Sequence, residues 1–337
     1  MSLRSGATGP GPSHEGDTPA FDAVFVGAAT YDAIALVDGF PGADERVVAQ
    51  SVVYAGGGPA ATAAVAASRL GARVAFVGTV GDDANGRAIL EGLSDEGVDV
   101  TGVSVSHTQD SAASVVIVDR TRGTRAICNR PAPLIDLAPG AGLIGSAPIV
   151  HVDHVGWGPL HASGLLPATA CLSVDAGNDI PGFRADRVDL QVPTVEALRR
   201  QYGDLPVDDL LVRAVADGAT VVVATDGSRG SHALTAAGQS AFVPALSVDV
   251  VSTLGAGDVF HGALVAAMVR RMPLRDQLAF ANATAALSCR ALDGRSGIPD
   301  LDTVLELMPE LRAELSPDPV PTTVPDTAPA TVAAPTH

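Results

Sequence analysis

The chain has 337 residues and is 47% hydrophobic, which is enough for one large α/β domain or two smaller domains. Its net charge of −17 argues against a nucleic-acid partner, and no apolar run is long enough for a membrane span. All 21 basic residues are arginines, which excludes a phosphate-loop lysine and Schiff-base chemistry on a side-chain amine. The three scattered cysteines are typical of a reducing compartment, so we expect a cytoplasmic protein.

The two ends of the chain differ in composition from its centre. Residues 1–20 are rich in Gly, Pro and Ser, and residues 316–337 are rich in Pro, Thr and Ala. Such segments cannot bury enough apolar surface to fold, so both are predicted to be disordered. Residues 21–315 are predicted to form the folded domain.

Strands and helices alternate along this domain. The predicted strands are 23–27, 74–78, 149–152, 171–174, 220–225 and a buried strand at 246–251, and the predicted helices are 60–70, 85–96, 207–217, 259–269 and 274–292. Alternation of this kind predicts an α/β fold whose mostly parallel sheet is covered on both faces.

Two β segments, at about 45–54 and 103–129, interrupt the alternation. The second contains a predicted pair of strands at 103–105 and 113–118, and a further strand at 124–129. Because these segments do not fit a parallel sheet, we predict that they form a small β lid beside it. One face of such a lid would be exposed, and a second copy of the chain is the simplest cover, which predicts a homodimer.

The stretch 252–258 places Gly255, Gly257 and Asp258 at a predicted turn from strand to helix. The glycines let backbone amides converge at the positive end of a helix, where they form an anion site. A carboxylate beside an anion site is electrostatically costly, which suggests a base that deprotonates a hydroxyl before it attacks a phosphoryl group. The alternative is that Asp258 is an ordinary helix cap in a tight turn.

Two other patterns invite a functional interpretation. Gly56–Gly58 could begin a dinucleotide fingerprint, but the third glycine and the later acidic residue of that motif are missing. His151, His154 and His161 could bind zinc, although residues 151 and 154 would point to opposite faces of an extended strand. Polar side chains that line a pocket are the alternative for these histidines.

Two motifs together carry a family resemblance. The stretch 56–66, followed by 70–72 and 77–86, resembles the first signature of ribokinase-like (PfkB) carbohydrate kinases, and 253–262 resembles their second. The resemblance covers residues 22–300. It implies a Rossmann-type three-layer sandwich with a β lid, and an ATP- and Mg²⁺-dependent transfer of the γ-phosphate to a hydroxyl of a ketohexose-like sugar, most simply a primary one.

The resemblance also implies roles for individual residues. Asp258 matches the catalytic base, and the amides of Gly255, Ala256 and Gly257 match the anion hole. The matched sugar-binding positions are Asp32, Gly57, Gly58, Arg46 and Asn129, and the matched nucleotide-binding positions are Thr225, Gly227, Gly230, Asn282 and Gly257.

The chain departs from the family pattern at several positions. Ser252 replaces the Asp that helps to bind a monovalent cation, which argues against activation by K⁺. The Asn-x-x-Glu motif that organises Mg²⁺ is altered to Thr194 and Ala197, so Glu196 is the candidate to hold Mg²⁺ through phosphate and water.

The motifs resemble those of bacterial sulfofructose kinases and ketohexokinase-like members most closely, but the stretch 151–157 lacks an arginine that sulfofructose kinases have there. The alternatives left open are a sulfofructose kinase proper, an adenosine-type nucleoside kinase and a non-catalytic sugar-binding regulator. A nucleoside kinase would need an aromatic residue in the lid, for which Tyr54 is the candidate.

Overall fold

The computed structural model describes residues 20–314. The disorder predicted for residues 1–19 and 316–337 therefore lies outside the described residues. Within the described part of the chain, no helix is long and apolar enough to cross a membrane.

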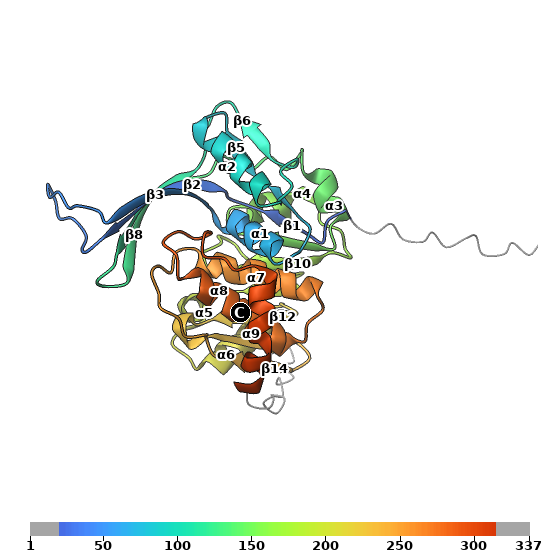
Figure 1. The fold of residues 1–337 in the computed structure, drawn as a ribbon. Helices are drawn as coiled ribbons and strands as arrows, with labels where there is room; N and C mark the ends of the chain where they lie inside the picture. Colours follow the sequence, from blue (N-terminus) through green and yellow to red (C-terminus); the bar gives the residue numbers. More distant parts are fainter. Residues whose placement is uncertain (1–19, 315–337) are drawn as a thin grey trace, which may run out of the picture.

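The centre of the fold is an eight-stranded sheet with the order β14-β13-β12-β11-β10-β9-β1-β4 (Figure 1). The strands from β4 to β12 run parallel, and β13 and β14 add an antiparallel edge. This architecture confirms the predicted α/β fold with a mostly parallel sheet. The bounds are β1 (Ala23–Val26), β4 (Val74–Val77), β9 (Ile149–Val152), β10 (Cys171–Asp175), β11 (Leu190–Val192), β12 (Val221–Thr225), β13 (Ser231–Thr235) and β14 (Ser240–Val243).

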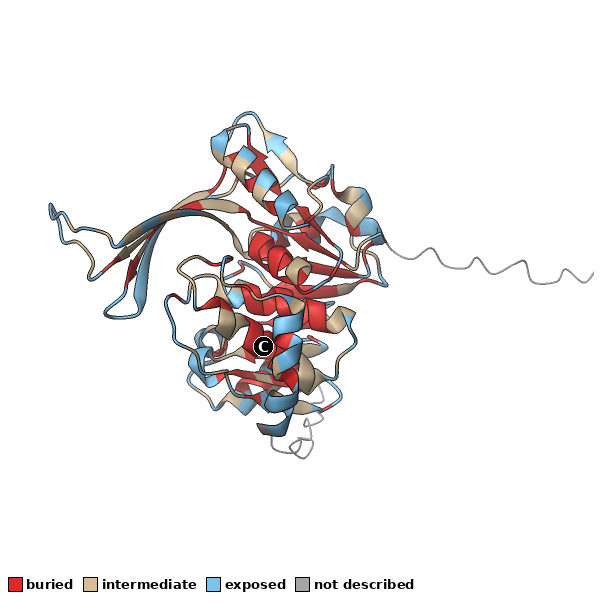
Figure 2. Ribbon diagram, in the orientation of Figure 1, coloured by how far each residue is buried: buried red, intermediate tan, exposed pale blue. Residues whose placement is uncertain are grey.

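Helices cover both faces of this sheet, which explains why its strands read as continuous apolar runs. In β1, Ala23 and Phe25 pack into one hydrophobic core, and Val24 and Val26 pack into another on the opposite face. Figure 2 shows these buried layers on either side of the sheet. One face carries α1 (Pro59–Arg69), α7 (Ala256–Val269), α8 (Leu274–Ser288) and α9 (Leu301–Glu314), and the other carries α3 (Ala141–Ser146), α4 (Trp157–Ser163), α5 (Val195–Tyr202) and α6 (Val207–Ala216).

The contact between α1 and α7 depends on small residues. A Cβ on Gly262 of α7 would lie 2.1 Å from the carbonyl oxygen of Ala63 in α1, so only glycine allows this approach. The alanine-rich sequence of α1 serves the same purpose, because short side chains let two helix backbones come close. The approach brings the first turns of α1 and α7 to the same edge of the sheet.

A second, four-stranded sheet with the order β3-β2-β7-β8 projects from the body and forms the lid (Figure 1). Its strands are β2 (Thr30–Val37), β3 (Ser51–Gly57), β7 (Ala113–Asp119) and β8 (Thr124–Arg130). Its inner face buries Ile34, Val116 and Val118. Its outer face exposes Val52, Tyr54 and Val115 by more than half. A lid was predicted, but its composition differs from the prediction.

The predicted lid was wrong in two respects. Strand β2 lies inside the lid sheet, although residues 30–37 were not predicted as a lid strand. Residues 103–105 do not pair with β7; instead β6 (Ser104–Ser106) pairs with β5 (Thr79–Gly81) in a separate two-stranded sheet next to α2 (Ala84–Asp95). Both differences concern pairing between distant segments, which short-range periodicity does not specify.

The predicted buried strand at 246–251 is also wrong. These residues form no strand, and Val250 and Val251 are 57% and 43% exposed. The sheet edge is already occupied by the antiparallel hairpin of β13 and β14. The side chains of Leu246, Val248 and Val250 line a cavity, and Leu246 also packs against the hydrophobic core.

Candidate active site

The loop that enters α7 presents free backbone amides. Gly255 is the N-cap of α7 and has a left-handed conformation with φ of 74°. Among the described residues, the amides of Gly255, Gly257 and Asp258 find no hydrogen-bond acceptor, and the amide of Ala256 makes only a long bond of 3.4 Å to the carbonyl of Thr253. Unpaired amides at the start of a long helix are suited to bind an anion.

The carboxyl group of Asp258 lies in the first turn of α7. Burial, followed by the negative charges of Asp175 and Asp153, raises the pKa of Asp258 to about 8. The positive charges of Arg125 and Arg295 act in the opposite direction. A carboxylate with a pKa near neutrality is suited to general-base catalysis.

Sequence reasoning missed two carboxylates beside Asp258. Asp175 ends β10, and Asp153 directly follows β9. Asp153 is fully buried and accepts hydrogen bonds from the amides of Ala28 (2.7 Å) and Gly156 (2.8 Å), so it ties the loop after β1 to the loop after β9. The carboxyl ends of parallel strands meet at one edge of a sheet, and this rule could have identified both residues.

Asp32 and the glycines of the first motif are in contact. Asp32 in β2 is 8% exposed and accepts hydrogen bonds from the hydroxyl of Thr30 (2.9 Å) and the amide of Ser114 (2.8 Å). Burial raises the pKa of Asp32. A Cβ on Gly57 would lie 2.4 Å from Oδ2 of Asp32, and Gly58 has a φ of 90° with no room for a side chain. These glycines therefore leave space around a buried carboxylate.

The inner face of the lid carries two further polar side chains. Asn129 is paired with Ser114 and Arg125 with Val118, so both side chains lie on the same face as Asp32. Arg46 is different, because it is exposed in the loop between β2 and β3 and makes no hydrogen bond or ion pair with a described residue.

The predicted nucleotide-binding residues meet around one cavity. The cavity has a volume of about 750 Å³ and lies beside the first turn of α7, with an apolar wall from Leu246, Val248 and Val250. Its lining includes Thr225, Gly227, Gly230, Gly257 and Asn282, all of which were predicted to bind nucleotide, together with Glu196.

Asn282 shapes this cavity from α8. It is 7% exposed, and its side-chain nitrogen donates hydrogen bonds to the carbonyls of Val243 (2.9 Å) and Pro244 (3.2 Å). The amide of Asn282 therefore fixes the chain where it leaves β14 and enters the apolar wall of the cavity.

The donor set around Glu196 fits Mg²⁺ held mainly by phosphate and water. Glu196 is exposed in the first turn of α5 and lines the cavity, while Thr194 caps this helix by accepting a 2.9 Å bond from the amide of Ala197. Residues 20–314 contain no group of three or more His, Cys, Asp or Glu side chains that could hold a metal on its own. Mg²⁺ commonly uses one or two carboxylates and keeps several waters.

The histidines are not arranged as a zinc site. His151 is buried, and its Nδ1 shares a 2.9 Å hydrogen bond with the hydroxyl of Ser173. His161 stacks on Trp157 at a ring-centroid distance of 5.2 Å. His151 and His161 therefore belong to different local environments.

Comparison with known proteins defines the class of this protein. The model of the pfkB family of carbohydrate kinases matches residues 20–172 and 185–301, and the chain belongs to this family. It is thus a phosphotransferase with an alcohol group as acceptor. Over 294 residues it is 29% identical to the ribokinase of Bacillus subtilis, covering 84% of this chain and 98% of that protein. It is 28% identical over 305 residues to the probable fructokinase-5 of Arabidopsis thaliana, covering 80% and 92%.

Solved structures support the same assignment. A crystal structure assigned to a ribokinase of Agrobacterium tumefaciens has a TM-score of 0.78 and 29% identity, covering 88% of this chain and all of that one. Arabidopsis thaliana ribokinase in complex with ribose and ATP has a TM-score of 0.72, with 86% and 99% coverage, and at 24% identity shows the fold alone. The ribokinase-like resemblance is confirmed, whereas the closer likeness to sulfofructose kinases stays a prediction.

Proposed function

We propose that this protein transfers the γ-phosphate of ATP to a primary hydroxyl of a ketohexose-like sugar. The observation that carries this proposal is the position of Asp258. It lies one residue after Gly257, whose backbone lines the cavity of about 750 Å³, and its own amide has no acceptor among the described residues. A base with a raised pKa therefore stands directly beside an anion site.

ATP occupies the cavity in this proposal. Its base lies against the apolar wall, and its phosphates extend toward the amides of Gly255 and Gly257. When bound, Mg²⁺ neutralises phosphate charge, and Glu196 holds it through water. The sugar lies between Asp258 and the lid, where Asp32, Asn129 and the backbone of Gly57 and Gly58 orient its hydroxyls.

The chemical step follows from this arrangement. Asp258 accepts the proton of the acceptor hydroxyl as the oxygen attacks the γ-phosphorus, and the bond from this phosphorus to the bridging oxygen of ADP breaks. The amides of Gly255 and Gly257 stabilise the charge on the transferring group. Each donor of this kind is worth about 3 kcal/mol of barrier. The lid excludes water that would otherwise accept the phosphoryl group.

A panel of acceptors tests the proposal. Phosphorylation is measured with ATP and D-fructose, D-ribose, sulfofructose or adenosine, and binding is measured by thermal shift with an ATP analogue. Turnover of fructose supports the proposal. Preference for sulfofructose or adenosine would instead favour the corresponding alternative, and sugar binding without turnover would favour a regulator. Tyr54 weakens the nucleoside alternative, because it stacks on Tyr31 at 6.4 Å on the outer face of the lid, away from Asp32.

We also propose that two copies associate through the outer face of the lid. Tyr54 is 67% exposed there, beside Val52 and Val115, and an apolar sheet face of this kind needs a cover. Light scattering should give the mass of a dimer, and Tyr54→Arg should give that of a monomer. A monomeric wild type would contradict this proposal.

Three smaller expectations complete the proposed function. Ser252 is 5% exposed and its hydroxyl accepts a 3.2 Å bond from the amide of Leu254, so we expect no activation when K⁺ replaces Na⁺. Arg46 remains a predicted sugar contact. We expect the reaction to take place in the cytoplasm, in keeping with three free cysteines.

A further inference from the structure

Arg295 is a buried cation without a direct carboxylate partner. It is 8% exposed in the loop that leads to α9, and its Nη2 donates a 2.8 Å hydrogen bond to the carbonyl of Gly57. Its Nε donates a longer bond of 3.3 Å to the hydroxyl of Thr62. No described carboxylate forms an ion pair with it. Burial of a charge is costly unless it is paired, so this position needs an explanation other than packing.

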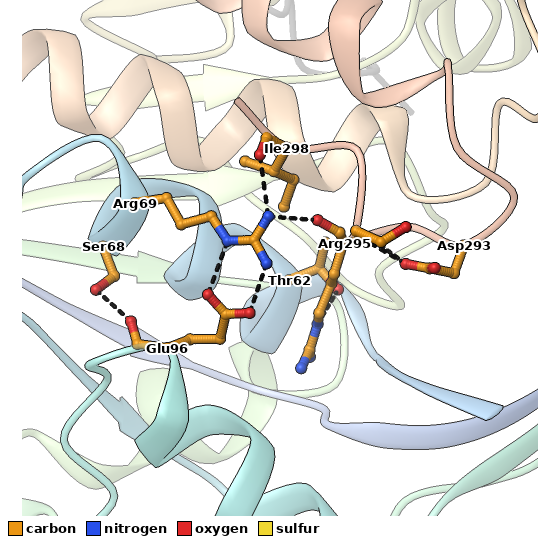
Figure 3. A network of polar contacts seen from close by, with 8 residues as sticks. Thr62, Ser68, Arg69, Glu96, Asp293, Arg295 and Ile298 are labelled. Carbon is orange, nitrogen blue, oxygen red and sulfur yellow. Dashed lines mark hydrogen bonds and ion pairs between the residues drawn. The ribbon is translucent and has the colours of Figure 1, made fainter. Parts of the chain in front are cut away.

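The backbone around Arg295 is held from two sides (Figure 3). Arg69 of α1 donates hydrogen bonds to the carbonyls of Arg295 (2.7 Å) and Ile298 (2.9 Å), and is itself paired with Glu96. The side chain of Asp293 accepts a 2.8 Å bond from the amide of Arg295. These hydrogen bonds to Arg69 and Asp293 fix the loop, and the loop in turn positions the guanidinium of Arg295.

The loop that carries Arg295 contacts both the loop that enters α7 and the glycines beside Asp32. The Cα of Gly294 lies 2.8 Å from where a Cβ of Gly255 would be. Gly294 therefore packs on residues 252–255, the loop that enters α7, which we call the anion loop. The side chain of the next residue, Arg295, donates a hydrogen bond to the carbonyl of Gly57, which also faces the carboxylate of Asp32. Gly56 leaves room for the guanidinium, because a Cβ there would lie 2.3 Å from Nη1 of Arg295.

The charge of Arg295 acts on both functional carboxylates. It lowers the pKa of Asp32 and of Asp258, opposing the effect of burial on each. Burial lowers the pKa of Arg295 itself to about 10, so it is protonated at neutral pH.

We propose that Arg295 is a positioning residue for the acceptor: its guanidinium holds the Gly56–Gly57 edge against Asp32 and supplies the fixed positive charge that balances Asp32 and Asp258. The proposal rests on the proposed function, because it concerns the same site. It predicts separate effects for the charge of Arg295 and for its hydrogen bonds.

The charge is tested without any substrate. Proteins labelled with ¹³C at aspartate carboxyls are titrated by NMR, and Asp258 is assigned with the Asp258→Asn variant. Arg295→Gln should raise the titration midpoint of Asp258, because a nearby positive charge is lost while that of Arg125 remains. Arg295→Lys should keep the wild-type midpoint. Because this measurement needs no sugar, its failure is distinguishable from failure of the proposed function.

The hydrogen bonds are tested by steady-state kinetics with D-fructose or D-ribose, whichever the wild type phosphorylates. Both variants should raise the KM for sugar about tenfold or more and leave the KM for ATP within about twofold. Arg69→Gln is the matched control, because it loosens the same loop while the charge it removes is already paired with Glu96. It should lower Tm and shift the midpoint of Asp258 less than Arg295→Gln does, because the charge of Arg295 remains.

The proposal is overturned if Arg295→Gln keeps the wild-type midpoint of Asp258 and the wild-type KM for sugar while Tm falls as in Arg69→Gln. Arg295 would then be structural only. If Arg295→Gln does not fold, Arg295→Lys decides. For Arg295→Lys, a raised KM for sugar with a wild-type midpoint of Asp258 supports the proposal, and a wild-type KM for sugar overturns it.

Discussion

The Nη1 of Arg125 donates a 2.8 Å hydrogen bond to the hydroxyl of Thr253. Arg125 belongs to lid strand β8, and Thr253 to the anion loop before α7. Both residues also line the cavity of about 750 Å³. The bond thus connects the lid directly to the loop whose amides are proposed to bind the transferring phosphate. We therefore expect any movement of the lid to be coupled to the loop that enters α7.

Replacement of Arg125 by Ala is expected to lower kcat/KM by about 10²-fold, because a charged donor beside the anion loop is lost. Steady-state phosphorylation assays measure this effect. Arg120→Ala is the matched control, since Arg120 is an exposed lid arginine that pairs with Asp38. It should retain nearly full activity. Equal losses in both variants would show that lid stability, and not the contact with Thr253, is responsible.

Replacement of Asp258 by Asn is expected to lower kcat by about 10²- to 10⁴-fold, the usual contribution of a general base. The binding of ATP and sugar, measured by calorimetry, should remain close to that of the wild type. Asp249→Asn is a suitable control, because Asp249 is exposed in the preceding loop. Substantial turnover by the Asp258→Asn variant would disprove the proposed mechanism.

The activity of the wild type should depend on pH through Asp258. Its pKa is raised to about 8, so the base is mostly protonated at pH 7. The value of kcat/KM, which reports the free enzyme, should rise with pH and level off above about pH 8. A profile that is flat between pH 6 and 9 would contradict the assignment of Asp258 as the base.

The same pKa shift has a consequence for stability. The pKa of Asp258 is higher in the folded protein than the ordinary value of 3.8, so the folded state binds more protons between these two limits. The contribution of this carboxyl group to stability is present below about pH 4 and is lost as the pH rises through about 8. The Tm of Asp258→Asn should therefore increase relative to wild type over this range, as scanning calorimetry can measure.

Replacement of Gly57 by Ala should impair sugar binding. The new Cβ would lie 2.4 Å from Oδ2 of Asp32 and 2.6 Å from the hydroxyl of Thr30, so the carboxylate must move. We expect the KM for sugar to rise about tenfold. Gly92→Ala is the control, because nothing lies within 4 Å of its Cβ position in α2. That variant should be slightly stabilised, as alanine favours helices. A wild-type KM in Gly57→Ala would exclude Gly57 from the sugar site.

The local parts of the structure were predictable from sequence. The alternation of strands and helices predicted the main sheet, and one continuous stretch held the glycines and Asp258 of the anion site. The predicted nucleotide positions from Thr225 to Asn282 do line one cavity. The family motifs were informative because each is a short segment. Its glycines and the helix that follows them largely determine its conformation.

The contacts between distant segments were decided by tertiary structure. Asp153 and Asp175 approach Asp258 because β9 and β10 are neighbours in the sheet. Arg125 reaches Thr253 across 128 positions, and Arg295 reaches Gly57 across 238. Such contacts depend on strand order, register and loop packing, and local periodicity specifies none of these. The sequence by itself therefore predicted the candidate anion loop and Asp258 as its base, whereas the fold decided which charges surround Asp258 and how the lid contacts this loop.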